Sequence, residues 1–144
     1  MREATTGAFA RMKVLFTPYS GGAIAHVARL LPIADELAAR GHSILFTTSV
    51  SKKAFVEAAG HEVRGDGHAD VNLNDEHDQG LGYFRRNRAL FLDWLGDELA
   101  AAEAFRPDVI VASPSFFGPI AGLKYGIPQA SVINAQWLPE FKGL

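Results

Sequence analysis

The sequence has no cysteine, no long run of apolar residues and no marked excess of charge of one sign. The absence of cysteine excludes a disulfide framework, a thiolate zinc site and a cysteine nucleophile, and it favours a reducing, cytoplasmic compartment. No apolar run approaches the roughly 18 residues that span a membrane, and the first residues lack the apolar core of a signal peptide. Fourteen Lys and Arg against sixteen Asp and Glu give a net charge of -2, which disfavours binding to nucleic acid or to an anionic membrane.

Apolar residues make up 48% of the 144 residues, which suits one domain with its own core. Residues 1–11 show no periodic pattern, and Met12 followed by Lys13 is typical of the start of a domain. We therefore interpret residues 1–11 as a leader or tag and expect the fold to begin at Lys13.

Short β-rich runs alternate with longer helical patterns after Lys13, which indicates a parallel sheet covered by helices. Strands are predicted around residues 14–16, 43–48, 62–64, 108–112 and 128–134. Helices are predicted at 31–40, 51–59 and 82–105, and in a short segment that ends at 125–126. Residues 26–30 are expected to lead loosely into the first helix, because Pro32 favours a first turn. The predicted fold class is α/β, a Rossmann-like open parallel sheet with helices on both faces and strand order 3-2-1-4-5.

Residues 65–80 are polar and hold few core candidates, so we expect a long mobile loop there. The segment from Asp70 opens like a calcium-binding loop, but Asp75 and Leu81 stand where that loop needs a glycine and a bidentate acid. Because the histidines of this part of the chain lack a regular ligand spacing, a solvated loop is a better interpretation than a metal site. Those histidines are His61, His68 and His77. The helix that follows is expected to face the core with Phe84, Arg88, Phe91, Leu95 and Leu99, and to turn Asp97 to water.

In such sheets, ligands bind beyond the carboxyl ends of the strands, near the point where the strand order reverses. This rule selects the loops Tyr19–His26, after the first strand, and Ser113–Phe117, after the fourth. The first loop contains Ser20, Gly21 and Gly22, but it does not match G-x-G-x-x-G, so a dinucleotide site is disfavoured. The two glycines serve either a substrate or a tight turn against a neighbouring backbone.

His26 has the chemistry of a general base at this edge of the predicted sheet. A neutral imidazole beside flexible glycines can take a proton from a substrate hydroxyl at neutral pH. Its position alone fits a structural or an exposed histidine equally well, so the residues by themselves leave both interpretations open.

Four spaced segments resemble the family-1 glycosyltransferases, which are two-domain GT-B enzymes that move a sugar from a nucleotide diphosphate to a small acceptor. His26–His42 is similar to their first helix, which runs G-H-V-x-P, L-P-L-A-x-x-L and R-G-H, although Arg29 replaces the first Pro and Ala25 the usual Gly. The three other matching segments are Ala59–Val63, Arg106–Val111 and Tyr125–Pro128. The likeness extends from Lys13 to about Asn134 and favours a bacterial member that acts on natural products.

The resemblance implies that His26 is the general base of a transfer that inverts the anomeric centre. Ser113 stands where the family usually has an Asp that orients the imidazole, so Ser113 is the implied partner of His26. Ser20, Gly21 and Gly22 are expected to contact the substrate. The aromatic residues that could wall the acceptor pocket, each of which fits the core as well, are Phe84, Phe116, Phe117 and Trp137.

The resemblance also implies that residues 12–144 are a truncated N-terminal acceptor-side domain, and that the C-terminal nucleotide-sugar domain is absent. The nucleotide diphosphate sugar is then a co-substrate bound mainly by that domain, and no cofactor and no metal is expected. The expected partners are a small-molecule acceptor, the donor-binding domain and, through the surface left uncovered, a second copy in a homodimer. The fragment alone is expected to be inactive.

Two alternatives to an enzyme stay open. One is a non-catalytic auxiliary or ligand-binding subunit with the same fold, which Ser113 favours because a hydroxyl brings no negative charge. The other is an unrelated flavodoxin-like ligand-binding domain, if the four matches are accidental.

Overall fold

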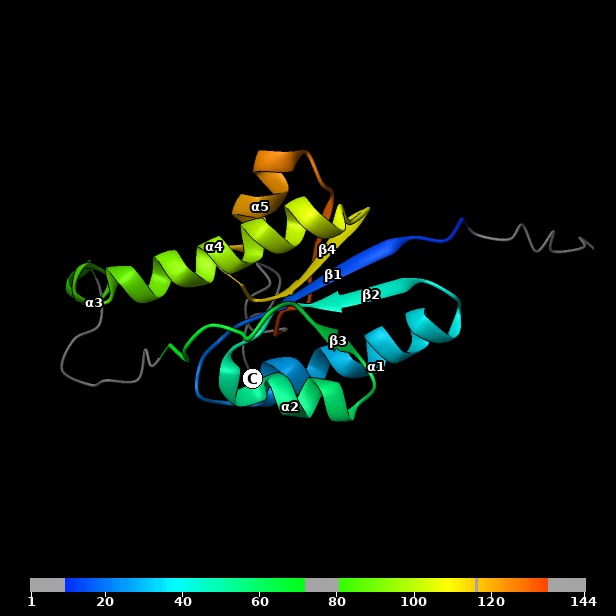
Figure 1. Ribbon diagram of the computed structural model, residues 1–144, viewed down its shortest axis with the longest axis horizontal. Helices are drawn as coiled ribbons and strands as arrows, with labels where there is room; N and C mark the ends of the chain where they lie inside the picture. Colours follow the sequence, from blue (N-terminus) through cyan, green and yellow to red (C-terminus); the bar gives the residue numbers. More distant parts are fainter. Residues whose placement is uncertain (1–9, 72–80, 116, 135–144) are drawn as a thin grey trace, which may run out of the picture.

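The computed structural model describes residues 10–71, 81–115 and 117–134, which form a parallel sheet between two layers of helices (Figure 1). The strands are β1 (Lys13–Pro18), β2 (Ser43–Phe46), β3 (Glu62–Val63), β4 (Val109–Ser113) and β5 (Gln129–Ser131). All neighbours are parallel, and their order is β3-β2-β1-β4-β5. The predicted fold class and strand order are therefore confirmed.

Helices cover both faces of the sheet (Figure 1). One face carries α1 (Ala25–Ala39) and α2 (Val50–Ala58), and the other carries α4 (Arg88–Phe105) and α5 (Gly118–Tyr125), with α3 (Leu81–Arg86) before α4. We call these the α1 face and the α4 face. Alternate residues of β1 supply the two cores, since Val14 and Phe16 pack on the α1 face and Leu15 packs on the α4 face.

Helix α1 begins at Ala25, so the prediction of a loose segment over residues 26–30 is wrong. Pro32 lies inside the helix rather than in its first turn. Val27 and Leu30 are fully buried, and burial of this apolar stripe outweighs the hydrogen bond that Pro32 cannot donate. As a result, His26 is held in the first turn of a regular helix.

The predicted helix over residues 82–105 is interrupted at Asn87, between α3 and α4. The predicted core face fails at Phe84, which is 41% exposed, and at Arg88, which is also exposed. The interruption changes the phase of the helical stripe, and the residues that α4 buries are Phe91, Trp94, Glu98, Ala101 and Ala102. A carboxyl group thus occupies a position that the apolar pattern could not assign to the core.

The first part of the predicted mobile loop is bonded to the segments that follow β1 and β2. The backbone N–H groups of Val50 and Val71 donate to the carbonyl oxygens of His68 and Ser20, at 2.8 and 2.7 Å. The interpretation of His68 as part of a solvated loop is wrong, because its side chain is buried under α4. Residues 72–80, with His77, lie outside the described residues.

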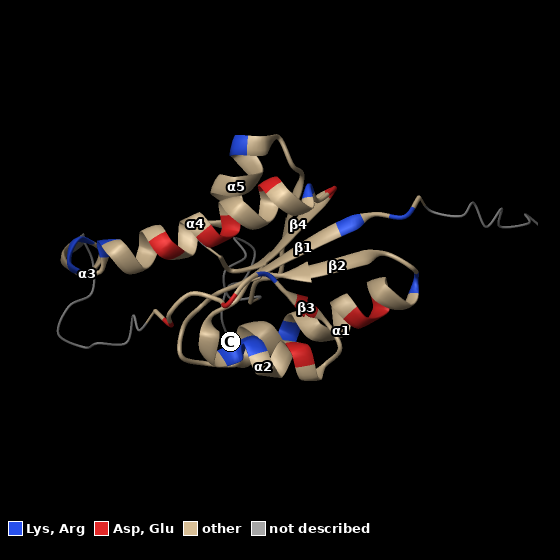
Figure 2. Ribbon diagram, viewed as in Figure 1, with Lys and Arg blue, Asp and Glu red and all other residues tan. Residues whose placement is uncertain are grey.

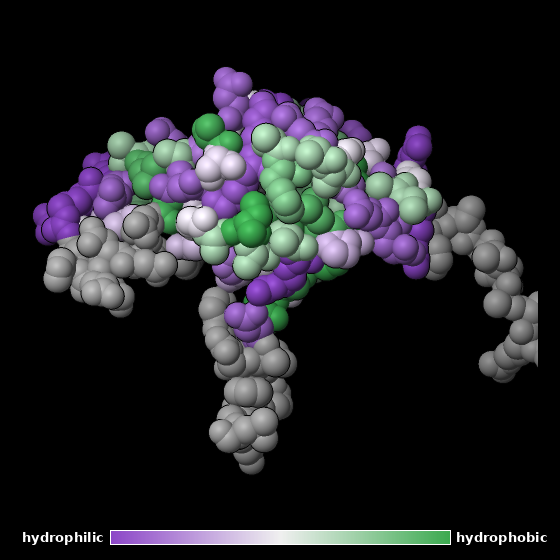
Figure 3. All heavy atoms as spheres, turned by 90° about the horizontal axis from the view of Figure 1, so that it is seen from below, coloured by the Kyte–Doolittle hydropathy of each residue, from purple (hydrophilic) through white to green (hydrophobic). Residues whose placement is uncertain are grey.

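Both α1 and α2 carry basic and acidic residues, whereas the charged residues of α4 beyond its first position are all acidic (Figure 2). Seen from the side of α1 and α2, hydrophobic and hydrophilic residues are interspersed (Figure 3). No helix in the described part of the chain combines the length and the apolar character needed to cross a membrane.

Candidate active site

His26 lies at the carboxyl edge of the sheet because β1 leads through a short loop directly into α1 (Figure 1). Its ring meets the Tyr19 ring edge to face, with the centroids 5.2 Å apart. The side chain is half-buried, and its Nδ1 atom is buried without a hydrogen-bond partner among the described residues. The imidazole is therefore held in place by packing, with one ring nitrogen unused.

The surroundings of His26 favour its neutral form. Burial lowers the pKa of the imidazole below its ordinary value, and the positive charges of Arg29 and Lys52 lower it further. A lowered pKa leaves the ring uncharged at neutral pH, which is the form that can accept a proton from a hydroxyl.

Ser113, the predicted partner of His26, is the last residue of β4 and is fully buried. It alternates with Val111, which belongs to the core of the α1 face, so Ser113 and His26 lie on the same side of the sheet. However, Ser113 Oγ forms no hydrogen bond with any described residue, and neither does Nδ1 of His26. The two residues share an edge of the sheet, but the implied hydrogen bond between them is not formed.

The loop residues predicted to contact substrate divide into two buried residues and one exposed residue. Ser20 is fully buried, and its hydroxyl lies 2.5 Å from Nε2 of His68. Gly21 is buried too, and a Cβ at this position would collide with the ring of Tyr19. Only Gly22 is exposed with open space around it. The close approach at Gly21 favours the interpretation of a tight turn.

A buried histidine that the sequence did not single out links three segments. His68 receives or donates hydrogen bonds at both ring nitrogens, with Ser20 at Nε2 and with Asp97 Oδ2 at Nδ1, 2.9 Å away. Its ring stacks on Trp94 at 5.5 Å. The only sequence signal was the position of Asp97, one helical turn after Trp94, but a charged side chain there is usually assigned to water. Ser20 and both ring nitrogens of His68 already have hydrogen-bond partners within the chain, so this group acts as a clamp on the loop that follows β1.

Lys52 is a buried cation at the start of α2, with only 2% of the residue exposed. Its Nζ atom donates to Asp70 Oδ1 at 2.7 Å and to Ser49 Oγ at 3.1 Å. Burial alone would raise the pKa of Asp70, but hydrogen bonds from Lys52, Ser49 and Ser51 bring it below its ordinary value. Asp70 is thus ionised and balances one of the two positive charges near His26.

Glu98 is a fully buried carboxyl group on the α4 face. Its Oε1 atom accepts hydrogen bonds from Trp94 Nε1 at 2.7 Å and from Ser115 Oγ at 2.9 Å. Burial raises its pKa to about 8, although these two hydrogen bonds oppose the shift. Glu98 is therefore mainly protonated at neutral pH, and it links α4 to the loop that follows β4.

The aromatic residues predicted to wall an acceptor pocket have different surroundings. The Phe84 ring lies tilted against that of Phe91, with the centroids 4.6 Å apart, and Phe84 is partly exposed. Phe117 meets Trp94 edge to face at 4.9 Å, within the aromatic cluster around Tyr19. Its packing fits the core interpretation. Phe116 and Trp137 lie outside the described residues.

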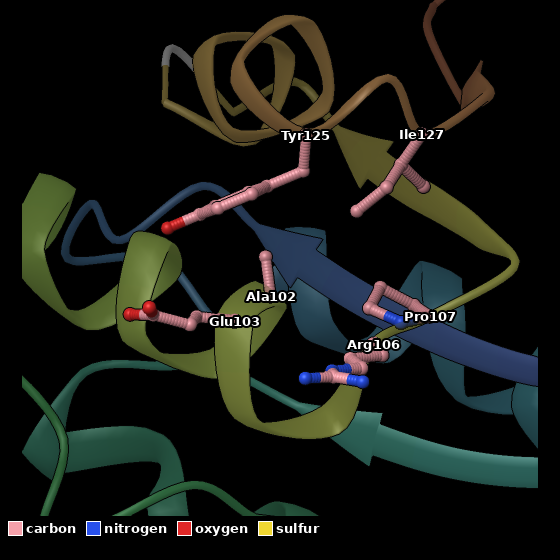
Figure 4. Close-up of a pocket in the computed structure, with 6 residues that line it drawn as sticks. All are labelled: Ala102, Glu103, Arg106, Pro107, Tyr125 and Ile127. Atoms are coloured by element: carbon pink, nitrogen blue, oxygen red, sulfur yellow. The ribbon is translucent and has the colours of Figure 1, made fainter.

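A cavity of about 450 Å³ lies at the opposite end of the sheet (Figure 4). Its lining residues are Ala102, Glu103, Arg106, Pro107, Tyr125 and Ile127, which precede β4 and β5 or end α4 and α5. It is remote from His26, so we do not assign it to the active site. Across residues 10–71, 81–115 and 117–134, no three His, Asp or Glu side chains gather as they would around a metal ion.

Comparison with known proteins finds that the similar proteins are glycosyltransferases. No protein-family profile matches it. It is 32% identical over 143 residues to 4'-demethylrebeccamycin synthase from Lentzea aerocolonigenes, a match that covers 88% of this chain and 32% of that protein. The crystal structure of the glycosyltransferase SnogD from Streptomyces nogalater matches 85% of this chain and 35% of its own, with 26% identity and a TM-score of 0.65.

A second similar structure was solved with a small molecule bound. The spinosyn rhamnosyltransferase SpnG, complexed with spinosyn aglycone, matches 89% of this chain and 37% of its own, with 23% identity and a TM-score of 0.64. Another structure of that protein holds thymidine diphosphate. The chain spans about a third of the length of each of these proteins. Over nearly all of its own length, it has the fold of the GT-B enzymes and resembles the natural-product glycosyltransferases, as its sequence predicted.

Proposed function

We propose that the chain is the acceptor-binding domain of an inverting glycosyltransferase, which moves a sugar from a nucleotide diphosphate sugar to a hydroxyl group of a small natural product. The observation that carries the proposal is His26, a neutral imidazole fixed at the carboxyl edge of the sheet. The likeness to enzymes named for rebeccamycin and spinosyn supports the substrate class.

In the proposed reaction, His26 accepts the proton of the acceptor hydroxyl while the hydroxyl oxygen forms a bond to the anomeric carbon. The bond from that carbon to the phosphate oxygen breaks, and the nucleotide diphosphate leaves with the electron pair from the opposite face of the sugar. The configuration at the anomeric carbon is thereby inverted. Removing the proton as the oxygen attacks is worth about 10²–10⁴ in rate.

The donor is assigned to a second domain beyond the described residues. In this chain Ser20 and Gly21 are buried within the loop after β1, so this loop does not form an open glycine-rich cradle for a diphosphate. Thymidine diphosphate in one SpnG structure supports a nucleotide donor for the whole protein. We expect calorimetry of this chain alone with a thymidine diphosphate sugar to show no binding, and clear binding would contradict the division of roles.

The test of the base is His26→Ala in a protein that joins this chain to a nucleotide-sugar domain. Sugar transfer to a phenolic acceptor should fall by about 10²–10⁴, while circular dichroism stays unchanged. The matched control is His42→Ala, because His42 lies at the other end of the sheet, where its Nδ1 accepts a hydrogen bond from Met12 N. Transfer by His26→Ala at the unmodified rate would remove His26 from the mechanism.

A non-catalytic ligand-binding subunit is the second candidate, and Ser113 is the observation in its favour. A base of this kind is usually oriented by a carboxylate, whereas Ser113 is uncharged and forms no hydrogen bond to His26. Acceptor binding by the chain with no transfer in the joined protein would favour this candidate.

A further inference from the structure

Buried polar atoms without partners gather on the α1 face at the carboxyl edge of the sheet. Of the six buried side-chain atoms that lack hydrogen bonds among the described residues, four belong to this face: His26 Nδ1, Arg29 Nη1, Thr48 Oγ1 and Ser113 Oγ. Buried polar groups in native proteins are usually satisfied, so four orphans in one region require a reason.

The sheet register brings the strand residues of this group into one row. Ser113 pairs with Pro18, and Phe46 pairs with Phe16. Thr48 lies two residues after Phe46. Thr48 therefore lies about level with Pro18, on the side that Phe46 shares with α1. Helix α1 packs on β1, β2 and β4, and its first turn, with His26, begins at the same carboxyl edge of the sheet.

The charge of this edge is positive. Arg29 forms no ion pair with any described residue, whereas the ammonium group of Lys52 is paired with Asp70. Both α1 and α2 begin here, and neither has a side chain that caps its first N–H groups. The first N–H of α2, that of Val50, already donates to the His68 carbonyl oxygen, so the features that attract negative charge are the N-terminus of α1 and the unpaired guanidinium.

We propose that this edge binds an oxyanion, a carboxylate or phosphate group of the substrate, through Arg29, His26 and Thr48. The donor set excludes a metal ion, because a guanidinium is always charged and has no lone pair to offer. A carboxylate or phosphate accepts several hydrogen bonds at once and matches the planar guanidinium group. Assigning the anion to the acceptor molecule rests on the proposed function, whereas the anion site itself does not.

The anion has a consequence for the base. If it accepts the Nδ1–H of His26, the neutral ring is held in the tautomer whose Nε2 can accept a proton. The substrate would then provide the negative charge that Ser113 cannot provide. Arg29 and Thr48 are positioning and binding residues in this scheme, and His26 alone receives the proton.

The test compares two probes that differ in one group, which is an ionised carboxylate in the first and an uncharged carboxamide in the second. We expect calorimetry of this chain to give a Kd at least tenfold lower for 6-hydroxy-2-naphthoate than for its carboxamide. Arg29→Met should remove that preference, and Arg29→Lys should restore part of it. The matched control is Arg40→Met, because Arg40 lies at the other end of α1 in an exposed pair with Glu36. Equal binding of the two probes, or binding of neither, would overturn the proposal, and this comparison needs no variant.

A second readout reports on the ring itself. Binding of the naphthoate should raise the pKa of His26, because an anion offsets the effect of the positive charges of Arg29 and Lys52. The pKa is measured from the pH dependence of the C–H signals of the imidazole ring in NMR. An unchanged pKa on saturation would place the anion elsewhere and contradict the site. Thymidine diphosphate and thymidine form a second pair of probes, and an Arg29-dependent preference for the diphosphate would assign the anion to the donor. Preference for the naphthoate without sugar transfer in the joined protein would refute the proposed function and leave the anion site standing.

Discussion

At the carboxyl edge, the two faces of the sheet differ in how far their buried polar groups are hydrogen-bonded. On the α4 face, His68 is bonded at both ring nitrogens and the Oε1 atom of Glu98 accepts two hydrogen bonds. On the α1 face, His26 and Arg29 have buried nitrogens without partners. A satisfied cluster rigidifies a fold, whereas unsatisfied donors beside an unpaired charge are suited to a ligand. The comparison separates a supporting face from a binding face.

The α4 face has two unpartnered atoms of its own, and they lie near each other. Both Thr17 Oγ1 and Glu98 Oε2 lie beside Gly118, where a Cβ atom would contact each of them. Because Glu98 is mainly protonated at neutral pH, its carboxyl group has a proton to offer to an oxygen such as that of Thr17. This pair therefore differs from the α1 face, where the unpartnered nitrogens belong to a cation and an imidazole.

The largest predicted effect is on the stability of the supporting face. Glu98→Ala leaves Trp94 Nε1 and the Ser115 hydroxyl without their acceptor and opens a cavity, so the free energy of unfolding should fall by about 3–5 kcal/mol. Glu98→Gln keeps an uncharged acceptor and should cost about 1 kcal/mol or less. Urea unfolding monitored by tryptophan fluorescence measures both. A loss below about 1 kcal/mol for Glu98→Ala would show that the α4 face does not depend on this group.

The pH dependence of stability gives the next effect. The pKa of Glu98 is raised from 4.5 to about 8 in the folded chain, so the folded state holds a proton that the unfolded state has released. This contribution is fully present below pH about 4.5 and is lost as the pH rises toward 8, by up to about 1.4 kcal/mol per pH unit. Urea unfolding at several pH values should show this fall. Glu98→Gln should flatten it between pH about 6 and 8, and an equally steep fall in that variant would assign the proton to another group.

The sequence predicted the topology well because parallel strands and their helices leave strong local patterns. The run Val14–Phe16 is apolar throughout because both faces of β1 are covered, and Gly41 ends the first helix with a positive φ. The order of the predicted strands was enough to place His26 correctly at the carboxyl edge of the sheet. The errors arose where distant contacts decide the outcome. Pro32 is accommodated inside α1 by packing against the sheet, and no local rule reports that burial.

The supporting face could not have been predicted from the sequence. His68 and Asp97 are 29 residues apart; His68 lies in a polar stretch, and Asp97 is a charged residue in a largely apolar helix, so the sequence assigns neither to a buried contact. Glu98 stands at a core position that only the tertiary structure reveals, because two donors from different segments converge on it. Polar residues enter the core when long-range partners satisfy them, and a single sequence does not display such partners.

The smallest effects come from a matched pair of histidines, one on each face. His68→Ala removes two hydrogen bonds and a ring stacked on Trp94, so the free energy of unfolding should fall by about 2 kcal/mol. His26→Ala removes a half-buried ring with an unpartnered Nδ1, so the loss should stay within about 0.5–1 kcal/mol. Urea unfolding at one pH compares them directly. If His26→Ala were the more destabilising of the two, His26 would belong to the support of the fold and the division between the faces would fail.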